Sequence, residues 1–209
     1  MRADDIVTAT NAQRSMLRWV ATGAALTVAP AHAHVAQGDV TGGLIAGFLH
    51  PILGFDHVVA MVAVGILGAQ LGRPAIYVLP ITFPLVMAAG GVLGVMRVPI
   101  PGIETGIAAS ALVLGAMIAL AARPPLAVTA LIVAVFAIFH GYAHGAELPA
   151  AANAVSYAFG FVVATGLLHA LGILIGTVRA WHRGAAALRV VGAAIALIGV
   201  YYLIRAWTS

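Results

Sequence analysis

The chain has 209 residues, of which 63% are hydrophobic and 8% are charged, and its mean hydropathy is +1.08. Soluble domains carry about a quarter charged residues, so this composition excludes a soluble globular protein and indicates an integral membrane protein. The net charge of +4 comes from ten Arg residues and no Lys. Because these Arg residues are scattered between apolar runs, they indicate membrane topology and give no case for nucleic-acid binding.

The first 33 residues have the pattern of a cleavable secretory signal peptide. A polar stretch that ends with Arg14 and Arg18 precedes an apolar run, residues 19–28, that is too short to span a membrane. A small-x-small triplet follows and predicts cleavage before His34. A retained helix, which would give seven spans, is the alternative. Met16 is an alternative start, because a more compact signal begins there.

Six apolar runs follow and predict an all-α, polytopic bundle of transmembrane helices. Each run is about 17–25 residues long, the length that a helix needs to cross the hydrocarbon core, and alternating barrel strands are absent. Short connections leave no soluble domain, so we expect residues 34–209 to form one six-span transmembrane domain. The expected helices cover residues 51–71, 75–95, 103–122, 126–146, 153–177 and 185–206.

The loop charges predict the orientation of these spans. A cleaved signal places the mature N-terminus outside, and alternation of the spans then assigns five Arg residues to the inside and two to the outside. This bias obeys the positive-inside rule and agrees with the independent signal-peptide prediction. The inner set is Arg73, Arg123, Arg179, Arg183 and Arg189, and the outer set is Arg97 and Arg205.

The segment before the first span is unusual, because residues 42–49 are apolar but too short to cross a membrane. This segment is either half-inserted before a helix that starts at Pro51, or part of one long helix kinked there. In the kinked form Pro51 offers no N–H to the carbonyl of Gly47, which leaves that oxygen for a ligand or water.

Proline and glycine residues inside the spans predict how the helices bend and pack. Pro80 and Pro84 are expected to bend the second span. Three pairs of glycines at a spacing of four allow helices to approach closely, as small residues do in membrane proteins. These pairs are Gly90 with Gly94, Gly141 with Gly145, and Gly172 with Gly176.

Two groups of polar residues interrupt the apolar spans. They are His50, Asp56 and His57 around the start of the first span, and His140, His144 and Glu147 at the end of the fourth. The second group has the spacing i, i+4 and i+7, which places its members on one face of a helix. Both groups lie at a similar depth near the outer surface, so one site between two helices could collect them.

The chemistry of these residues points to a metal or proton site. An ionised Asp56 within a span requires a cation, a partner or a water-filled cavity, because burying it there costs at least a few kcal/mol. The chain has no Cys, so a metal must be held by His, carboxylate, Met or backbone oxygen. Neutral imidazole with carboxylate suits nickel, cobalt, zinc or copper. One buried His is usually a hydrogen-bonded core residue, and imidazoles also relay protons.

Three further residues are candidates for a metal pathway. His34 would be the mature N-terminus and would offer an imidazole outside, or it is an arbitrary neighbour of the cleavage site. Glu104 lies at the outer mouth of the third span, where it is either a ligand or complements the helix dipole. His169 lies in the inner half of the fifth span and either marks a path toward the cytoplasm or is a bonded interior histidine.

The two motifs make the chain similar to the HupE/UreJ family of bacterial membrane proteins, over nearly its whole length. The first motif reads His-Pro-x-x-Gly-x-Asp-His at residues 50–57 and is followed by Met-x-Ala-Val-Gly at 61–65. The second reads Phe-His-Gly-x-Ala-His-Gly-x-Glu at residues 139–147. The first motif also resembles the His-x4-Asp-His pattern of nickel/cobalt permeases, with one residue more here.

This resemblance implies a function in metal uptake at the bacterial inner membrane. Members of the family are implicated in the uptake of nickel, sometimes cobalt, beside hydrogenase or urease maturation. By the resemblance, the metal-handling residues are His50, Asp56, His57, His140, His144 and Glu147. We therefore expect a permease, not an enzyme, that passes Ni²⁺ or Co²⁺ from the periplasm to the cytoplasm and carries no prosthetic group.

Two other functions compete with the permease hypothesis. One is an intramembrane metalloenzyme of the diiron hydroxylase or desaturase type, because His140 and His144 resemble one histidine box, although the other boxes are missing. The other is a metal-binding accessory protein for hydrogenase or urease maturation. The chain lacks a P-loop motif, so uptake driven by the membrane potential is the simplest energetics. Proton coupling and a homo-oligomer are left open.

Overall fold

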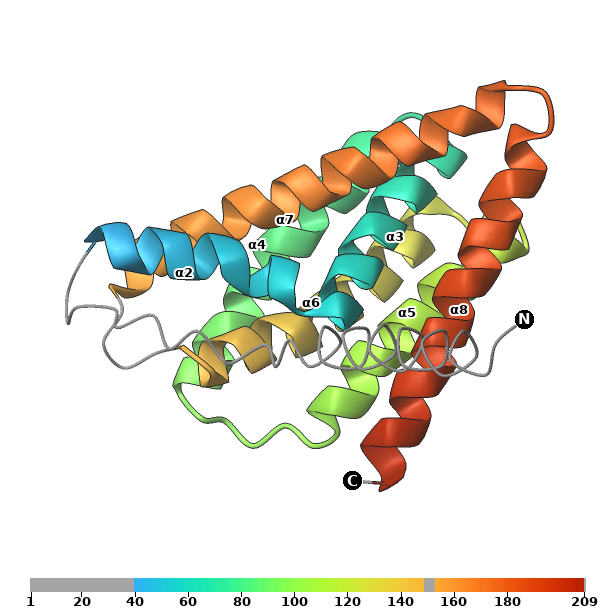
Figure 1. The fold of residues 1–209 in the computed structure, drawn as a ribbon. Helices are drawn as coiled ribbons and strands as arrows, with labels where there is room; N and C mark the ends of the chain where they lie inside the picture. The colour runs from blue at the N-terminus through green and yellow to red at the C-terminus, as the bar shows by residue number, and fades with distance from the viewer. Residues whose placement is uncertain (1–39, 149–152, 209) are drawn as a thin grey trace, which may run out of the picture. The chain divides into compact units, whose positions relative to one another are not determined.

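Helices make up nearly all of the structure, a computed structural model that describes residues 40–148 and 153–208. The helices are α2 (Val40–Leu53), α3 (Phe55–Leu71), α4 (Ala75–Val95), α5 (Ile103–Ala119), α6 (Leu126–Ala146), α7 (Ala154–Gly176), the short 3₁₀ helix η1 (Thr177–Ala180) and α8 (Gly184–Thr208) (Figure 1). The all-α prediction is therefore confirmed. The predicted signal peptide and His34 lie outside the described residues.

Several of these helices are suited to cross a membrane. Within the described residues, four are long and apolar enough: α4, α6, α7 extended through η1, and α8. The bent pair of α2 and α3 passes the same test as one unit and would be a fifth span. Helix α5 is apolar but has 17 residues, fewer than each of these four helices. The chain is thus a multi-pass membrane protein, and the count of six spans stays a prediction.

The break between α2 and α3 differs from both forms that the sequence suggests. Helix α2 continues through Pro51 to Leu53, Gly54 adopts an extended backbone, and α3 begins at Phe55. The two helices meet at an angle of 81°. Pro51 lies in the last turn of α2, where its missing N–H removes one hydrogen bond just before the helix ends. The predictions of a helix start or a kink at Pro51 are therefore wrong, because the break comes three residues later.

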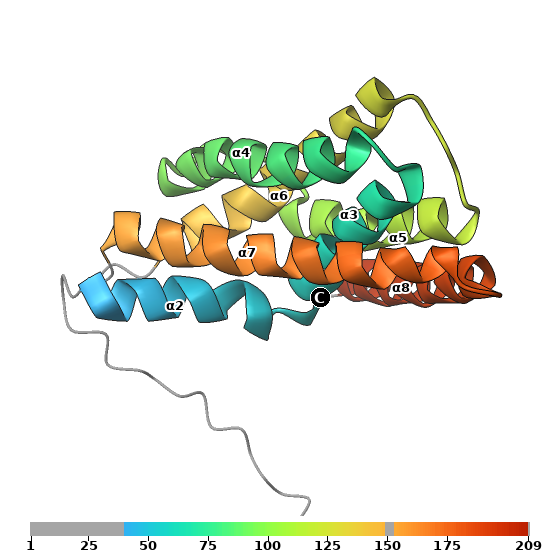
Figure 2. The same ribbon diagram turned by 90° about the horizontal axis from the view of Figure 1, so that it is seen from above.

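Helix α7 is the element against which the broken pair packs. The first half of α7 lies along α2, with the Cα of Gly47 so close to Tyr157 that an added Cβ would be 2.0 Å from its carbonyl oxygen (Figure 2). The second half lies along α3, where a Cβ on Gly65 would be 2.2 Å from the carbonyl oxygen of His169. The break between α2 and α3 consequently faces the middle of α7.

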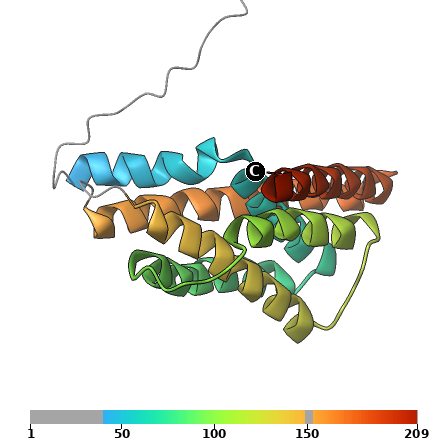
Figure 3. The ribbon, with the colours of Figure 1, turned by 90° about the horizontal axis from the view of Figure 1, so that it is seen from below.

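Glycines also bring the other helices together, as their spacing predicts. A Cβ on Gly141 or Gly145 of α6 would lie 2.0 Å from a backbone carbonyl of α4. Gly172 packs against Val62 and Gly65 of α3, so this prediction is confirmed as well. Helices α5 and α8 lie side by side in the same way (Figure 3). These contacts need small residues, because the backbones themselves touch.

Arginines cap the end of the bundle that is opposite the two polar motifs. The guanidinium of Arg179 donates to the carbonyls of Ala69 and Gln70 at the end of α3. Arg189 Nε donates to the carbonyl of Ala119 at the end of α5, over 2.8 Å. Cations are favourable there because the last carbonyls of a helix lack partners within it.

Candidate metal centre

The structure brings the two polar motifs into contact. His50 lies in the last turn of α2 and His57 in the first turn of α3, while His140 and His144 occupy the last turns of α6. The ring centroids of His144 and His50 are 4.8 Å apart, those of His144 and His57 are 4.4 Å apart, and those of His57 and His140 are 4.9 Å apart. Four imidazoles thus form one continuous cluster, which we call the histidine cluster.

A carboxylate lies at the exposed side of this cluster. Glu147 follows α6 directly, and its Oε2 is 3.3 Å from His50 Nε2. This contact lowers the pKa of Glu147, so the carboxylate stays ionised. One ligand atom each from His50, His144 and Glu147 lie within 4.8 Å of one another, close enough to hold one metal ion. The Glu147 side chain is 58% exposed, which makes it accessible to a cation from solution.

Asp56 fixes the tautomer of His57. Asp56 Oδ1 is 2.7 Å from His57 Nδ1 and also accepts the backbone N–H of His57 at 2.9 Å. An ionised carboxylate only accepts hydrogen bonds, so the imidazole proton of neutral His57 belongs on Nδ1. The lone pair is then on Nε2, which is buried and has no hydrogen-bond partner among the described residues. This carboxylate–histidine arrangement is typical of metal ligands.

Ser110 of α5 fixes the tautomer of His140 in a similar way. The Ser110 hydroxyl donates to the carbonyl of Ile107 at 2.6 Å, so toward His140 Nε2, 3.0 Å away, it is the acceptor. His140 therefore carries its proton on Nε2 and its lone pair on Nδ1. Nδ1 is buried and unpartnered in the described part of the chain. The sequence gives no signal for Ser110, which is one hydroxyl in an apolar helix 30 residues from His140.

His144 is the residue of the cluster whose hydrogen-bonding capacity is least used. Its side chain is buried, and neither ring nitrogen has a partner among the described residues. Leaving a buried polar atom without a partner costs about 1–3 kcal/mol. A metal ion held by His50, His144 and Glu147 would take one of these nitrogens as a ligand, so the donor set fits an ion that prefers imidazole.

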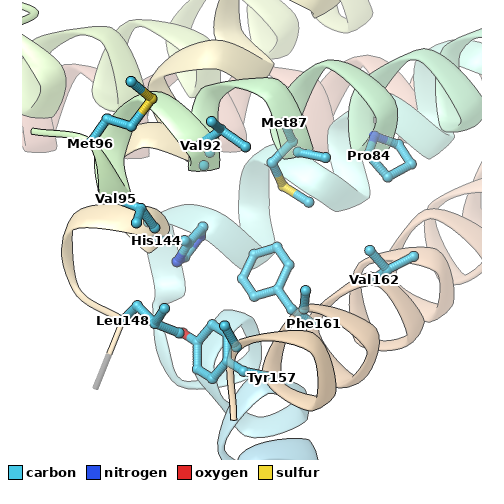
Figure 4. A pocket seen from close by; sticks show the side chains of 16 residues that line it. Pro84, Met87, Val92, Val95, Met96, His144, Leu148, Tyr157, Phe161 and Val162 are labelled. Atoms are coloured by element: carbon cyan, nitrogen blue, oxygen red, sulfur yellow. The ribbon is translucent and has the colours of Figure 1, made fainter. Parts of the chain in front are cut away.

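An apolar cavity adjoins the cluster between α4, α6 and α7. It measures about 390 Å³ and is lined mainly by apolar side chains, with His144 and Tyr157 as its polar members (Figure 4). Phe161 stands beside His144, with the ring centroids 4.2 Å apart. Such a lining offers few ligands to a hydrated ion, so this cavity is not a route for one.

The remaining predicted residues lie apart from the cluster. Glu104 is exposed in the first turn of α5 and is not part of the group of potential metal ligands. His169 is buried on α7. The fully buried Phe83 of α4 is a neighbour of both the cluster and His169, with its ring centroid 5.5 Å from that of His140 and 5.3 Å from that of His169. Phe83 is a second neighbour of the site that no sequence motif marks.

Comparisons with known proteins agree with the resemblance of the motifs. The model of the family described as HupE / UreJ protein matches residues 22–202. The chain is similar to Protein HupE of Rhizobium leguminosarum bv. viciae, with 44% identity over 174 residues that cover 83% of this chain and 90% of that protein. No solved structure matches the chain. Membership of this family supports a transport or accessory role related to nickel and cobalt and gives no support to the metalloenzyme alternative. The chain belongs to the HupE/UreJ family.

Proposed function

We propose that this protein is a permease that carries Ni²⁺, or Co²⁺, across the bacterial inner membrane into the cytoplasm. The observation that carries the proposal is the histidine cluster, which joins two motifs that are distant in sequence and presents several unpartnered buried nitrogens. Imidazole ligands suit these borderline divalent ions. The metal is cargo, and the proposal needs no prosthetic group.

Capture begins at the exposed carboxylate. Glu147 and His50 would take a hydrated cation from solution, and His144 lies within reach of the same ion. The ion would then exchange further waters for His57 Nε2 and His140 Nδ1, whose lone pairs are aligned by Asp56 and Ser110. Transport requires that this binding be strong enough for capture and weak enough for release.

The ends of three helices meet at the cluster. Helix α2 ends three residues after His50, and α6 ends two residues after His144, so the negative ends of two helix dipoles lie there. The positive end of α3 lies there as well, and the carboxylate of Asp56 in its first turn offsets it. Interrupted helices are a common way to place binding groups within a membrane, because backbone that is not helical must line a site or be buried in protein. The 81° bend between α2 and α3 therefore supports a transport role.

The direction of transport follows from the proposed orientation. With a periplasmic mature N-terminus, the polar motifs face the periplasm and the arginine-capped end faces the cytoplasm. Glu104 would then attract cations at the outer mouth, and His34, which lies outside the described residues, would add an outer imidazole. His169 would lie on the inner part of the pathway.

Nickel uptake into intact cells tests the proposal. Cells that lack their own nickel importers would express the unmodified chain or its His57→Ala or His140→Ala variant at matched membrane abundance. We expect radiolabelled nickel to accumulate with the unmodified chain and to fall to background with both variants. If the well-expressed unmodified chain supports no uptake of nickel or cobalt, the permease proposal fails. Tight metal binding without uptake would then favour the accessory role.

Asp56→Asn tests the role of the carboxylate behind His57. The amide retains the shape of Asp56 but not its charge, so the orientation and basicity of His57 are weakened while the helix is preserved. We expect nickel affinity, measured by calorimetry on purified protein, to fall about tenfold or more, as for other residues that support metal ligands. Asp56→Ala should have a larger effect. Unchanged affinity in the Asn variant would show that the charge of Asp56 does not act through His57.

A further inference from the structure

We infer that a second cation-binding site, which we call the inner site, lies deeper in the bundle. It is formed by His169 and Thr165 of α7 and the backbone carbonyl of Pro80 on α4. The inference rests on the proposed permease function, since it gives the transported ion a place to bind after it leaves the histidine cluster. Its ligands would be one imidazole nitrogen and two neutral oxygens, a set suited to a borderline divalent cation.

The first observation is a row of residues on one face of α7. Phe161, Thr165 and His169 follow at a spacing of four, so their side chains lie one above the other. Phe161 contacts His144, and the row leads from there toward the arginine-capped end. At 1.5 Å per residue, His169 lies about 12 Å farther along α7 than Phe161.

The second observation is that the polar atoms of this row are buried without partners. Thr165 is fully buried and His169 is 1% exposed. Thr165 Oγ1 and both ring nitrogens of His169 have no hydrogen-bond partner within the described residues. A structural histidine or threonine in an apolar helix interface would normally be hydrogen-bonded. The Thr165 oxygen and the lone-pair nitrogen of His169, one turn apart, therefore indicate a ligand.

The third observation comes from the prolines of α4. Pro84 has no N–H, so the carbonyl of Pro80, one turn earlier, lacks its normal donor within the helix. One ring nitrogen of His169 approaches this carbonyl as a hydrogen-bond donor, so the lone pair on the other ring nitrogen is the one left for a cation. Carbonyls released from helical hydrogen bonding are common cation ligands in transporters. Pro80 and Pro84 thereby have a role beyond bending the helix.

Phe83 lies at the boundary of the inner site and the histidine cluster. Its ring packs against both His140 and His169, at centroid distances of 5.5 and 5.3 Å. An ion must pass this ring to move from one set of ligands to the other. Two binding sites in series, each incomplete on its own, would keep the ion bound at every point and still allow its release.

The experiment uses the full-length protein with nickel as the probe. Purified variants are compared by equilibrium nickel binding and by initial nickel flux into proteoliposomes. Thr165→Val removes the hydroxyl and keeps the side-chain shape, whereas Thr165→Ser keeps the hydroxyl. His169→Gln removes the imidazole and keeps an N–H that is able to donate to Pro80. Thr129→Val is the matched control, because Thr129 is also buried but its hydroxyl is satisfied by the Pro125 carbonyl.

We expect Thr165→Val and His169→Gln each to bind one nickel ion fewer than the unmodified protein and to reduce flux about tenfold or more. Thr165→Ser and Thr129→Val should retain binding and flux. The inference is overturned if Thr165→Val and His169→Gln bind as many ions as the unmodified protein, or if flux persists in both. A chain that binds both ions but supports no flux would contradict the permease function, whereas the inference of the inner site would still hold.

Discussion

Replacing His144 with alanine is expected to reduce nickel uptake by about a hundredfold or more, an effect as large as the loss of His57 or His140. His144 is the member of the cluster that contacts both His50 and His57. It also belongs to the group with Glu147 that could hold a metal at the exposed side. Without it, the carboxylate and the deeper imidazoles would be separated, and an ion captured outside would lose its next ligand.

The matched control is His182→Ala. His182 is exposed in the turn before α8, at the end of the bundle opposite the cluster, so the same substitution there should leave uptake unchanged. Uptake is measured with radiolabelled nickel at equal membrane abundance of both variants. Substantial uptake by the His144→Ala variant would mean that the cluster is not on the transport pathway.

Replacing Gly141 with alanine is expected to destabilise the protein by about 1–3 kcal/mol or more, the size of an overpacked core. The added Cβ would be 2.0 Å from the carbonyl oxygen of Met87, and a backbone atom of α4 has little room to move away. Helix α6 would have to shift, and His140 and His144 would shift with it. Both the thermal stability of the detergent-solubilised protein and its nickel binding should therefore fall.

Gly166→Ala provides the control for this prediction. Gly166 is exposed on α7, and a Cβ there would meet no heavy atom within 4 Å. The substitution should be neutral or slightly stabilising, because alanine favours a helix over glycine by about 1 kcal/mol. Equal thermal stability of the Gly141 and Gly166 variants, measured by size-exclusion chromatography after heating, would contradict the tight contact between α4 and α6.

The sequence predicted the helices and the two motifs but not the place of the break. Hydropathy locates long apolar runs, and each of the six expected ranges coincides for most of its length with helix. The break at Gly54 was missed because proline is the stronger local signal, although Pro51 is tolerated in the last turn of α2. The 81° bend depends on how α2 and α3 pack along α7, which no local pattern encodes.

The supporting residues of the site were harder to predict for the same reason. The spacing of His140, His144 and Glu147 predicted that they share a helix face, and both motifs were expected at one depth. Ser110, Phe83 and Thr165 are single residues in apolar helices, and their contact with the histidines follows from helix packing. The i, i+4 spacing of Thr165 and His169 was the one available sign of the inner polar row.

Nickel flux through the purified protein tests the permease proposal most directly. The protein is reconstituted into liposomes that contain a nickel-sensitive dye, with a membrane potential that is negative inside. The proposal predicts a dye response that depends on external nickel and on the potential, and that disappears in the His57→Ala and His140→Ala variants. Protein that binds nickel but gives no response above empty liposomes would contradict transport and identify the cluster as an accessory metal site.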